Sequence, residues 1–253
     1  SVHPLFGLLA LPPVLALTKI LGLSQWTAVR ALLAAVAGLW GVGVFAVLRM
    51  TGCRRVESSA FTWVGMTSAG AVFWSCIPEI HTMASLTIVV ALLLVALATH
   101  RKVPELLEVF VSAGTLGLTV TNWMAGISAS FSHRSWRRTL QVSINAFFVV
   151  VILWVLRRSL TPSATFFLGN SSEAEHIRPA EALGSIRIAI AFLMHSMVMP
   201  AIALVERQGA AEWPIMIVQP SAIGSAGPWG MIASGLWGML LLIGIWAAVR
   251  IDR

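Results

Sequence analysis

Apolar residues in this chain follow one another in long runs, and the charged residues gather in the short segments between the runs. The clearest runs cover residues 26–48, 58–74, 83–98, 141–156, 186–205 and 231–249. An α-helix needs about 20 apolar residues to cross the hydrocarbon core of a bilayer. In lipid the backbone must bond within its own segment, as it does in a helix. The pattern predicts an all-α polytopic integral membrane protein with about seven to nine transmembrane or re-entrant helices.

The first apolar segment, residues 4–21, is short, and Pro12 and Pro13 interrupt it. A proline inside a helix costs about 3 kcal/mol, because it lacks an N–H group and collides with the preceding turn. We therefore expect this segment to lie at the membrane surface or to re-enter the membrane. A complete span is the alternative.

Basic residues follow two of the predicted spans and give the chain an orientation. They are Arg49, Arg54, Arg55, His100, Arg101 and Lys102. Because cytoplasmic loops of membrane proteins are enriched in Lys and Arg, both clusters should lie in the cytoplasm. The turn at residues 76–81 should then lie at the outer face. Cys53 and Cys76 flank one span, so they should lie on opposite faces, too far apart for a disulfide.

Two topologies fit the next segment. In the first, residues 106–121 rise to the outer face, residues 124–133 return as a short helix, and Arg134, Arg137 and Arg138 are cytoplasmic. In the second, residues 106–126 form one span and the three arginines lie outside. The count of Lys and Arg in the later loops favours the second topology.

The runs and loops divide the chain into four parts. They are a surface or re-entrant segment (1–25), a transmembrane core (26–156), a polar loop (157–183) and a C-terminal transmembrane hairpin (184–253). Charged residues make up 11% of the chain, against about 25% in soluble proteins. The net charge of +7 sits in clusters too short to line a nucleic-acid groove. The composition therefore implies membrane lipid as a partner and excludes nucleic acid.

Glu79 is the candidate with the clearest chemistry. It follows Pro78 at the predicted outer end of a span, and His81 lies two residues on. An ionisable residue beside apolar spans is costly, which makes it a candidate for function. A carboxylate with an imidazole can bind a divalent cation, orient an acceptor hydroxyl or transfer a proton. In the alternative interpretation, Glu79 only interacts with the positive end of the next helix dipole.

Three further places hold candidate residues. His3 lies near the start of the chain, Asn122 adjoins Trp123 at a predicted helix end, and Arg157 and Arg158 end a span. An arginine pair at the outer face can bind a lipid phosphate through bidentate hydrogen bonds, whereas at the inner face it anchors the topology. Trp123 is either a ligand-stacking residue or one of the aromatic residues of the membrane interface.

The order of these features resembles the GT-C superfamily of membrane glycosyltransferases, which use polyprenyl-phosphate sugars and include protein O-mannosyltransferases and aminoarabinose transferases. The pieces that carry the resemblance are His3-Pro4-Leu5-Phe6, Gly22-Leu23-Ser24, Ala28-Val29-Arg30, Leu48-Arg49, Gly52, Phe73-Trp74-Ser75, Pro78-Glu79 and Asn122-Trp123. Each piece alone is common, and their order and spacing carry the likeness. Nothing after about residue 160 matches the family's pattern.

The resemblance implies an activity and a location. A sugar would pass from a polyprenyl-phosphate donor to an acceptor, by inverting displacement, at the outer face of a bacterial cytoplasmic membrane. His3, Glu79 and His81 would belong to the catalytic site, with no cofactor beyond a divalent cation and no metal centre. Substrate would be bound by Asn122, Trp123, Arg157 and Arg158. The resemblance also makes residues 4–21 interfacial, places Arg30 near the outer face, and favours the first of the two topologies.

The chain departs from the family in one respect. The family's catalytic base is an Asp or Glu in the first outer loop, ahead of the His-Pro motif, and the one Asp here is Asp252. We therefore expect the family's first helix and catalytic loop to precede Ser1. The competing hypothesis is a non-catalytic integral subunit that packs within a larger membrane complex and contacts lipid or pigment. Whether the chain is an enzyme stays open at this point.

Overall fold

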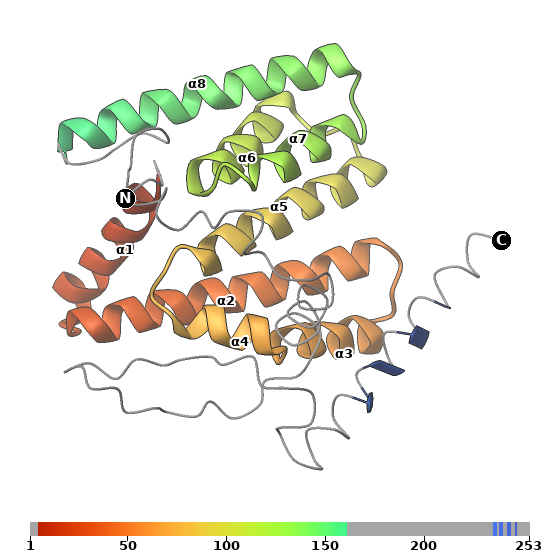
Figure 1. Ribbon diagram of the computed structural model, residues 1–253, viewed down its shortest axis with the longest axis horizontal. Helices are drawn as coiled ribbons and strands as arrows, with labels where there is room; N and C mark the ends of the chain where they lie inside the picture. The colour runs from red at the N-terminus through yellow and green to blue at the C-terminus, as the bar shows by residue number, and fades with distance from the viewer. Residues whose placement is uncertain (1–4, 161–234, 237, 240–241, 244–245, 247–253) are drawn as a thin grey trace, which may run out of the picture. The chain divides into compact units, whose positions relative to one another are not determined.

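The computed structural model describes residues 5–160, together with residues 235–236, 238–239, 242–243 and 246, which are helical (Figure 1). Residues 5–160 are mostly helical. Their helices are α1 (Phe6–Leu21), α2 (Gln25–Met50), α3 (Arg55–Met66), α4 (Ala69–Cys76), α5 (His81–His100), α6 (Glu105–Leu118), α7 (Trp123–Phe131) and α8 (Trp136–Leu160). Residues 5–62 and 74–160 belong to one compact unit, and the other described residues belong to a second.

Three of these helices are long and apolar enough to cross a membrane: α2, α5 and α8. Each exposes large apolar side chains, among them Leu39 on α2, Leu92 on α5 and Ile152 on α8. The expected all-α class holds for the described residues. The predicted span at residues 186–205 and most of the one at 231–249 lie outside them, as do His3 and residues 161–183.

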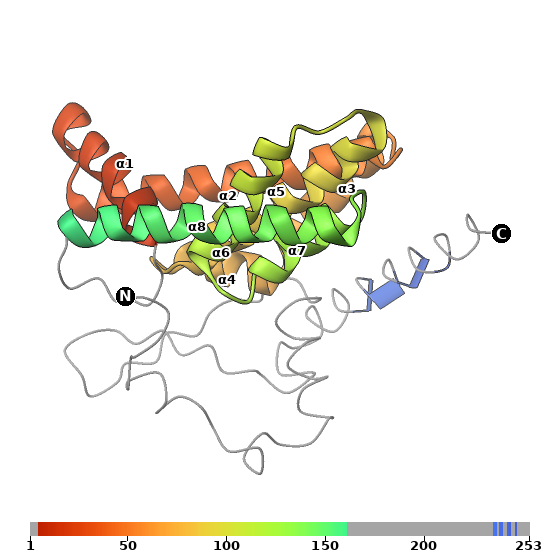
Figure 2. The same cartoon turned by 90° about the horizontal axis from the view of Figure 1, so that it is seen from above.

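Helix α5 lies in the middle of the first unit. It packs against α2 on one side and against α6 and α7 on the other, and α8 packs against α6 and α7 (Figures 1 and 2). The α2–α5 contact is close, since a Cβ added at Gly43 would lie 2.5 Å from Val89 Cγ1. The segment with two possible topologies forms the antiparallel pair α6 and α7, as the first topology predicted.

The predicted start of the helix at residues 141–156 was wrong. Helix α8 begins at Trp136, ahead of the expected residue 141, and carries Arg137 and Arg138 in its first turn. Helix α1 continues through Pro12 and Pro13. Proline fixes φ near the helical value, so the segment can stay helical although each proline lacks the N–H that a helix bonds. The αL conformation of Gly22 (φ 65°), whose N–H donates to the carbonyl of Leu17, ends α1.

The expected span at residues 58–74 is instead two short helices, α3 and α4. The side chain of Thr67 donates to the carbonyl of Trp63 (2.8 Å), and that of Ser68 donates to the carbonyl of Gly65 (2.7 Å). Ser68 Oγ also accepts from the N–H of Ala71 (3.3 Å), as at the start of a new helix. Hydroxyls of this kind compete with the backbone for hydrogen bonds, which accounts for the break.

The first unit has two ends, which we name after an acidic residue at each. At the Glu79 end α2 and α5 begin, α6 meets α7, and α8 ends. At the Glu108 end α2 and α5 end, α6 and α8 begin, and α7 ends. His100 Nε2 lies 2.9 Å from the carbonyl of Met50, which joins α5 to α2 at the Glu108 end. Helix α1 runs obliquely across the Glu79 end (Figure 1).

Candidate functional site

Glu79 and His81 lie together at the Glu79 end, on the turn between α4 and α5. His81 Nε2 is 3.4 Å from Glu79 Oε2, and both side chains are about half exposed. The ring of His81 packs against that of Trp74, with the ring centres 4.0 Å apart. An exposed ion pair contributes little to stability, at most about 1 kcal/mol. This pair is therefore open to solvent or ligand on a surface with an aromatic ring beside it.

The fold holds this turn in a fixed position. The hydroxyl of Thr82 donates to the carbonyl of Trp74 (2.7 Å), which joins the end of α4 to the start of α5. Ile80 is buried in a cluster with Val36 and Leu118. With Ile80 held inside, its neighbour Glu79 is left at the surface.

Asn122 lies close to the same turn. Its side-chain amide donates to the carbonyl of Ala84 in the first turn of α5 (2.8 Å). Ala84 is five residues beyond Glu79, so this bond fixes the start of α7 beside the start of α5. Two segments far apart in the sequence, Pro78-Glu79 and Asn122, thus come together at one end of the unit.

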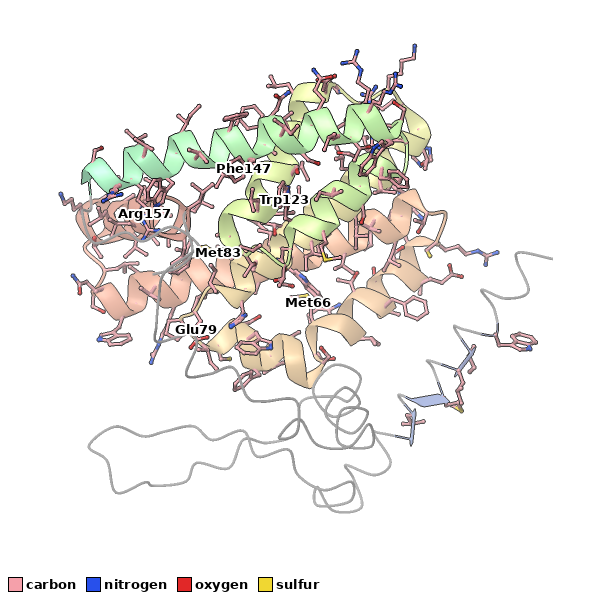
Figure 3. All side chains as sticks on the ribbon, turned by 45° about the horizontal axis from the view of Figure 1, so that its top comes forward. Met66, Glu79, Met83, Trp123, Phe147 and Arg157 are labelled. Atoms are coloured by element: carbon pink, nitrogen blue, oxygen red, sulfur yellow. The ribbon has the colours of Figure 1, made fainter. Side chains whose placement is uncertain are left out.

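Trp123 does not face this surface. Its indole N–H donates to the hydroxyl of Ser112 on α6 (3.2 Å), and its ring stacks on Phe147 of α8 with the ring centres 6.4 Å apart. Figure 3 shows Trp123 and Phe147 side by side, away from Glu79. Trp123 joins α6, α7 and α8, which is a packing role.

The two arginines at the end of α8 point in different directions. Arg157 is buried, and its guanidinium lies over Gly7 of α1, where an added Cβ would be 3.1 Å from Nε. Arg158 is exposed, and its guanidinium lies 5.5 Å from the ring centre of Trp154. Arg157 lies at the same end of the helices as Glu79 (Figure 3). A glycine at position 7 is what lets α1 pass over this side chain.

His3 lies outside the described residues, but the chain two residues on is fixed at the Glu79 end. Leu5 donates its N–H to the carbonyl of Gly117 at the end of α6 (2.9 Å), and its side chain is buried. A Cβ at Gly117 would overlap Leu5.

The charges at the Glu79 end are mostly positive. Of the four described carboxylates, Glu79 lies here, whereas Glu57, Glu105 and Glu108 lie at the other end. Four basic residues lie at or near the Glu79 end, namely Lys19, Arg30, Arg157 and Arg158. This balance favours an anionic ligand.

A second polar group, which the sequence did not reveal, lies at the Glu108 end. Glu108 is fully buried, and its Oε1 accepts from Arg134 Nη2 (2.7 Å) and Nε (3.0 Å). The same guanidinium donates to the carbonyl of Val103 (2.7 Å), and His133 Nε2 is 3.2 Å from Glu108 Oε1. The sequence signal was weak, since Glu108 stands in the first turn of a helix, where acidic residues are common.

The hydrogen bond with Glu108 raises the pKa of Arg134 above its usual value. A group with a raised pKa contributes its stabilisation at every pH below its unfolded value and loses it as the pH rises through the folded value. Both values are strongly alkaline for arginine. The Glu108–Arg134 pair therefore keeps its cation across the whole range in which the protein is handled.

No three of the His, Cys, Asp and Glu residues in the described segments come close enough to hold a metal ion. Comparison with protein-family models, with curated proteins and with solved structures found no match.

Proposed function

We propose that this chain forms part of a membrane glycosyltransferase that moves a sugar from a polyprenyl-phosphate donor to an acceptor. The Glu79 end would lie at the outer face of a bacterial cytoplasmic membrane. The observation that carries the proposal is the hydrogen bond from Asn122 to Ala84, which brings two motifs of the resemblance together. The second support is the burial of Arg157 against α1 at that same end.

The proposed reaction replaces one bond at the anomeric carbon by another and transfers one proton. The acceptor oxygen attacks the anomeric carbon, and the bond from that carbon to the phosphate oxygen breaks. The polyprenyl phosphate leaves with the electron pair, and the acceptor's proton passes to a carboxylate base. The resemblance assigns that base to the loop ahead of the His-Pro motif. Glu79 and His81 then position the acceptor through hydrogen bonds to its other polar groups, since orientation lowers the barrier.

The basic residues of the Glu79 end serve the donor. Charge develops on the phosphate as the sugar leaves, and fixed cations aimed at that charge stabilise the transition state. The exposed Arg158, Arg30 and Lys19 attract the anionic donor, while the buried Arg157 adds a further positive charge close to α1. Helix α1 crosses this end obliquely, as an interfacial helix beside a lipid substrate would.

Replacing Glu79 by Gln in the full-length protein tests the proposal. Membranes would be incubated with radiolabelled polyprenyl-phosphate-linked mannose and aminoarabinose, and transfer would be measured. We expect about a 100-fold loss or more in kcat, the size of effect given by losing one positioned catalytic-site group. Glu105→Gln is the matched control, since Glu105 is a partly exposed carboxylate at the other end, 3.5 Å from Arg138.

Unchanged turnover in Glu79→Gln would remove Glu79 from the site. An unaltered full-length protein that transfers neither sugar, yet co-purifies with other membrane proteins, would favour the non-catalytic subunit.

A further inference from the structure

Four buried polar atoms without a hydrogen-bond partner belong to residues at the Glu108 end. They are Glu108 Oε2, Ser130 Oγ, His133 Nε2 and Thr139 Oγ1. Glu108, Ser130 and Thr139 are almost completely buried. Although His133 Nε2 is 3.2 Å from Glu108 Oε1, its N–H is not aligned for a hydrogen bond. A buried polar group without a partner costs about 1–3 kcal/mol, so four such groups at one end of the unit point to a bound ligand.

The packing of the helices places Glu108, Ser130 and Thr139 at the same height along the helix axes. Helices α6 and α7 are antiparallel and in close contact, since a Cβ at Gly126 would lie 2.9 Å from Ser112 Cα. One turn further toward the Glu108 end, Glu108 on α6 therefore faces Ser130 on α7. The side chain of Arg134, four residues after Ser130, confirms this approach by bonding to Glu108.

Helix α8 places Thr139 at the same height as Glu108 and Ser130. Val109 of α6 and Val142 of α8 belong to one buried cluster. Thr139 lies one turn before Val142 and is therefore level with the first turn of α6, where Glu108 is found. Its N–H donates to the carbonyl of Ser135 (2.9 Å), and its hydroxyl is buried between the helices.

The charges decide which ligand fits. The carboxylate of Glu108 is already neutralised by the guanidinium of Arg134, which bonds to Oε1. A metal cation at Oε2 would leave a net positive charge in a buried place, which costs several kcal/mol. A neutral ligand that both donates and accepts avoids that cost. It can donate to the carboxylate oxygen and accept from the two hydroxyls.

We propose that an internal water molecule is bound between Glu108 Oε2, Ser130 Oγ and Thr139 Oγ1. Internal waters typically make about three hydrogen bonds to buried polar groups that lack other partners. This one joins three helices, α6, α7 and α8, at the end where α7 turns into α8. The site is separate from the Glu79 end and does not depend on the proposed transferase activity.

The sign of a stability change tests this water site. Thr139→Val keeps the shape of the side chain and removes the hydroxyl. If Thr139 binds the water, the apparent melting temperature of the full-length protein in detergent should fall by about 2–4 °C, the shift that 1 kcal/mol gives in a protein of this size. If the hydroxyl has no partner, its removal should leave the melting temperature unchanged or raise it. Thr62→Val is the matched control, because Thr62 Oγ1 is another buried atom without a partner, on α3.

Two further measurements complete the test. Ser130→Ala should also lower the melting temperature, and the double variant with Thr139→Val should lose less than the sum, since both hydroxyls bind one water. Replacing sodium chloride with choline chloride at constant ionic strength should leave the melting temperature unchanged, because the proposed ligand is water and not a cation. Additive losses, a Thr139→Val variant no less stable than the parent, or stabilisation by sodium would each overturn the proposal.

Discussion

Glu79 and Glu108 both stand within a few residues of an apolar helix, yet their surroundings differ. Glu79 is more than half exposed and has a histidine as its partner. Glu108 is fully buried and bonds to a guanidinium through one oxygen. An exposed carboxylate can exchange its partner for a ligand at little cost, whereas a buried one that loses its partner becomes an unpaired charge. This difference supports the proposed chemical role of Glu79 and a structural role for Glu108.

Glu108→Gln tests the structural role. Removing the carboxylate charge leaves the guanidinium of Arg134 without its counter-ion, and breaking a buried ion pair in this way costs about 3–5 kcal/mol. Because Arg134 is one-third exposed, we expect a loss near the lower figure, measured as a fall in apparent melting temperature. The double variant Glu108→Met with Arg134→Met should recover most of it, since both charges are then absent. Equal stability of Glu108→Gln and the parent protein would contradict the role.

Some contacts of the candidate residues could be predicted from the sequence, and others could not. The proximity of Glu79 and His81 followed from their spacing. The role of Trp123 could not be predicted, because interfacial, ligand-binding and buried tryptophans share the same apolar neighbours in sequence. Its hydrogen bond to Ser112 depends on the packing of α7 on α6. The Glu108–Arg134 pair joins residues 26 positions apart, and its approach follows from that same packing.

At the scale of the elements, the pair α6 and α7 decides where the later helices lie. The apolar run continues past residue 118 with few charges, so the run itself did not show where the chain turns. The count of Lys and Arg favoured one long span. The turn at Thr119–Asn122 instead reverses the chain, and Gly126 permits the return helix to approach α6 closely. Arg137 and Arg138 thereby lie at the Glu108 end, where Arg138 contacts Glu105 and Gln141.

Gly126→Ala tests this close approach. A Cβ at position 126 would lie 2.5 Å from Thr115 Oγ1 and 2.9 Å from the backbone of Ser112, so α6 and α7 would have to separate. Overpacking of this kind costs about 1–3 kcal/mol. Gly114→Ala is the matched control on α6, because a Cβ there meets nothing within 4 Å. It should be neutral or stabilise by up to about 1 kcal/mol through helix propensity. Equal melting temperatures for the two variants would contradict the packing.

At the scale of the molecule, the described segments hold three helices that can cross a membrane, with shorter helices packed between and beside them. The all-α class and the main apolar segments could be predicted from the sequence. A long apolar run that lies in lipid must form a helix, because its backbone groups can bond only to one another. The break between α3 and α4 could not, because it depends on the hydroxyls of Thr67 and Ser68, which are common in spans.

The proposed function requires that the Glu79 end faces the outside of the cell and that the Glu108 end faces the cytoplasm. The chain's own cysteines report on this directly, since Cys76 is exposed three residues before Glu79 and Cys53 follows α2 at the other end. Variants Cys53→Ser and Cys76→Ser of the full-length protein would be treated in intact spheroplasts with a membrane-impermeant maleimide. We predict that Cys76 reacts in intact spheroplasts and that Cys53 reacts only after permeabilisation. Reaction of Cys53 from the outside, or of both cysteines from one side, would contradict the account.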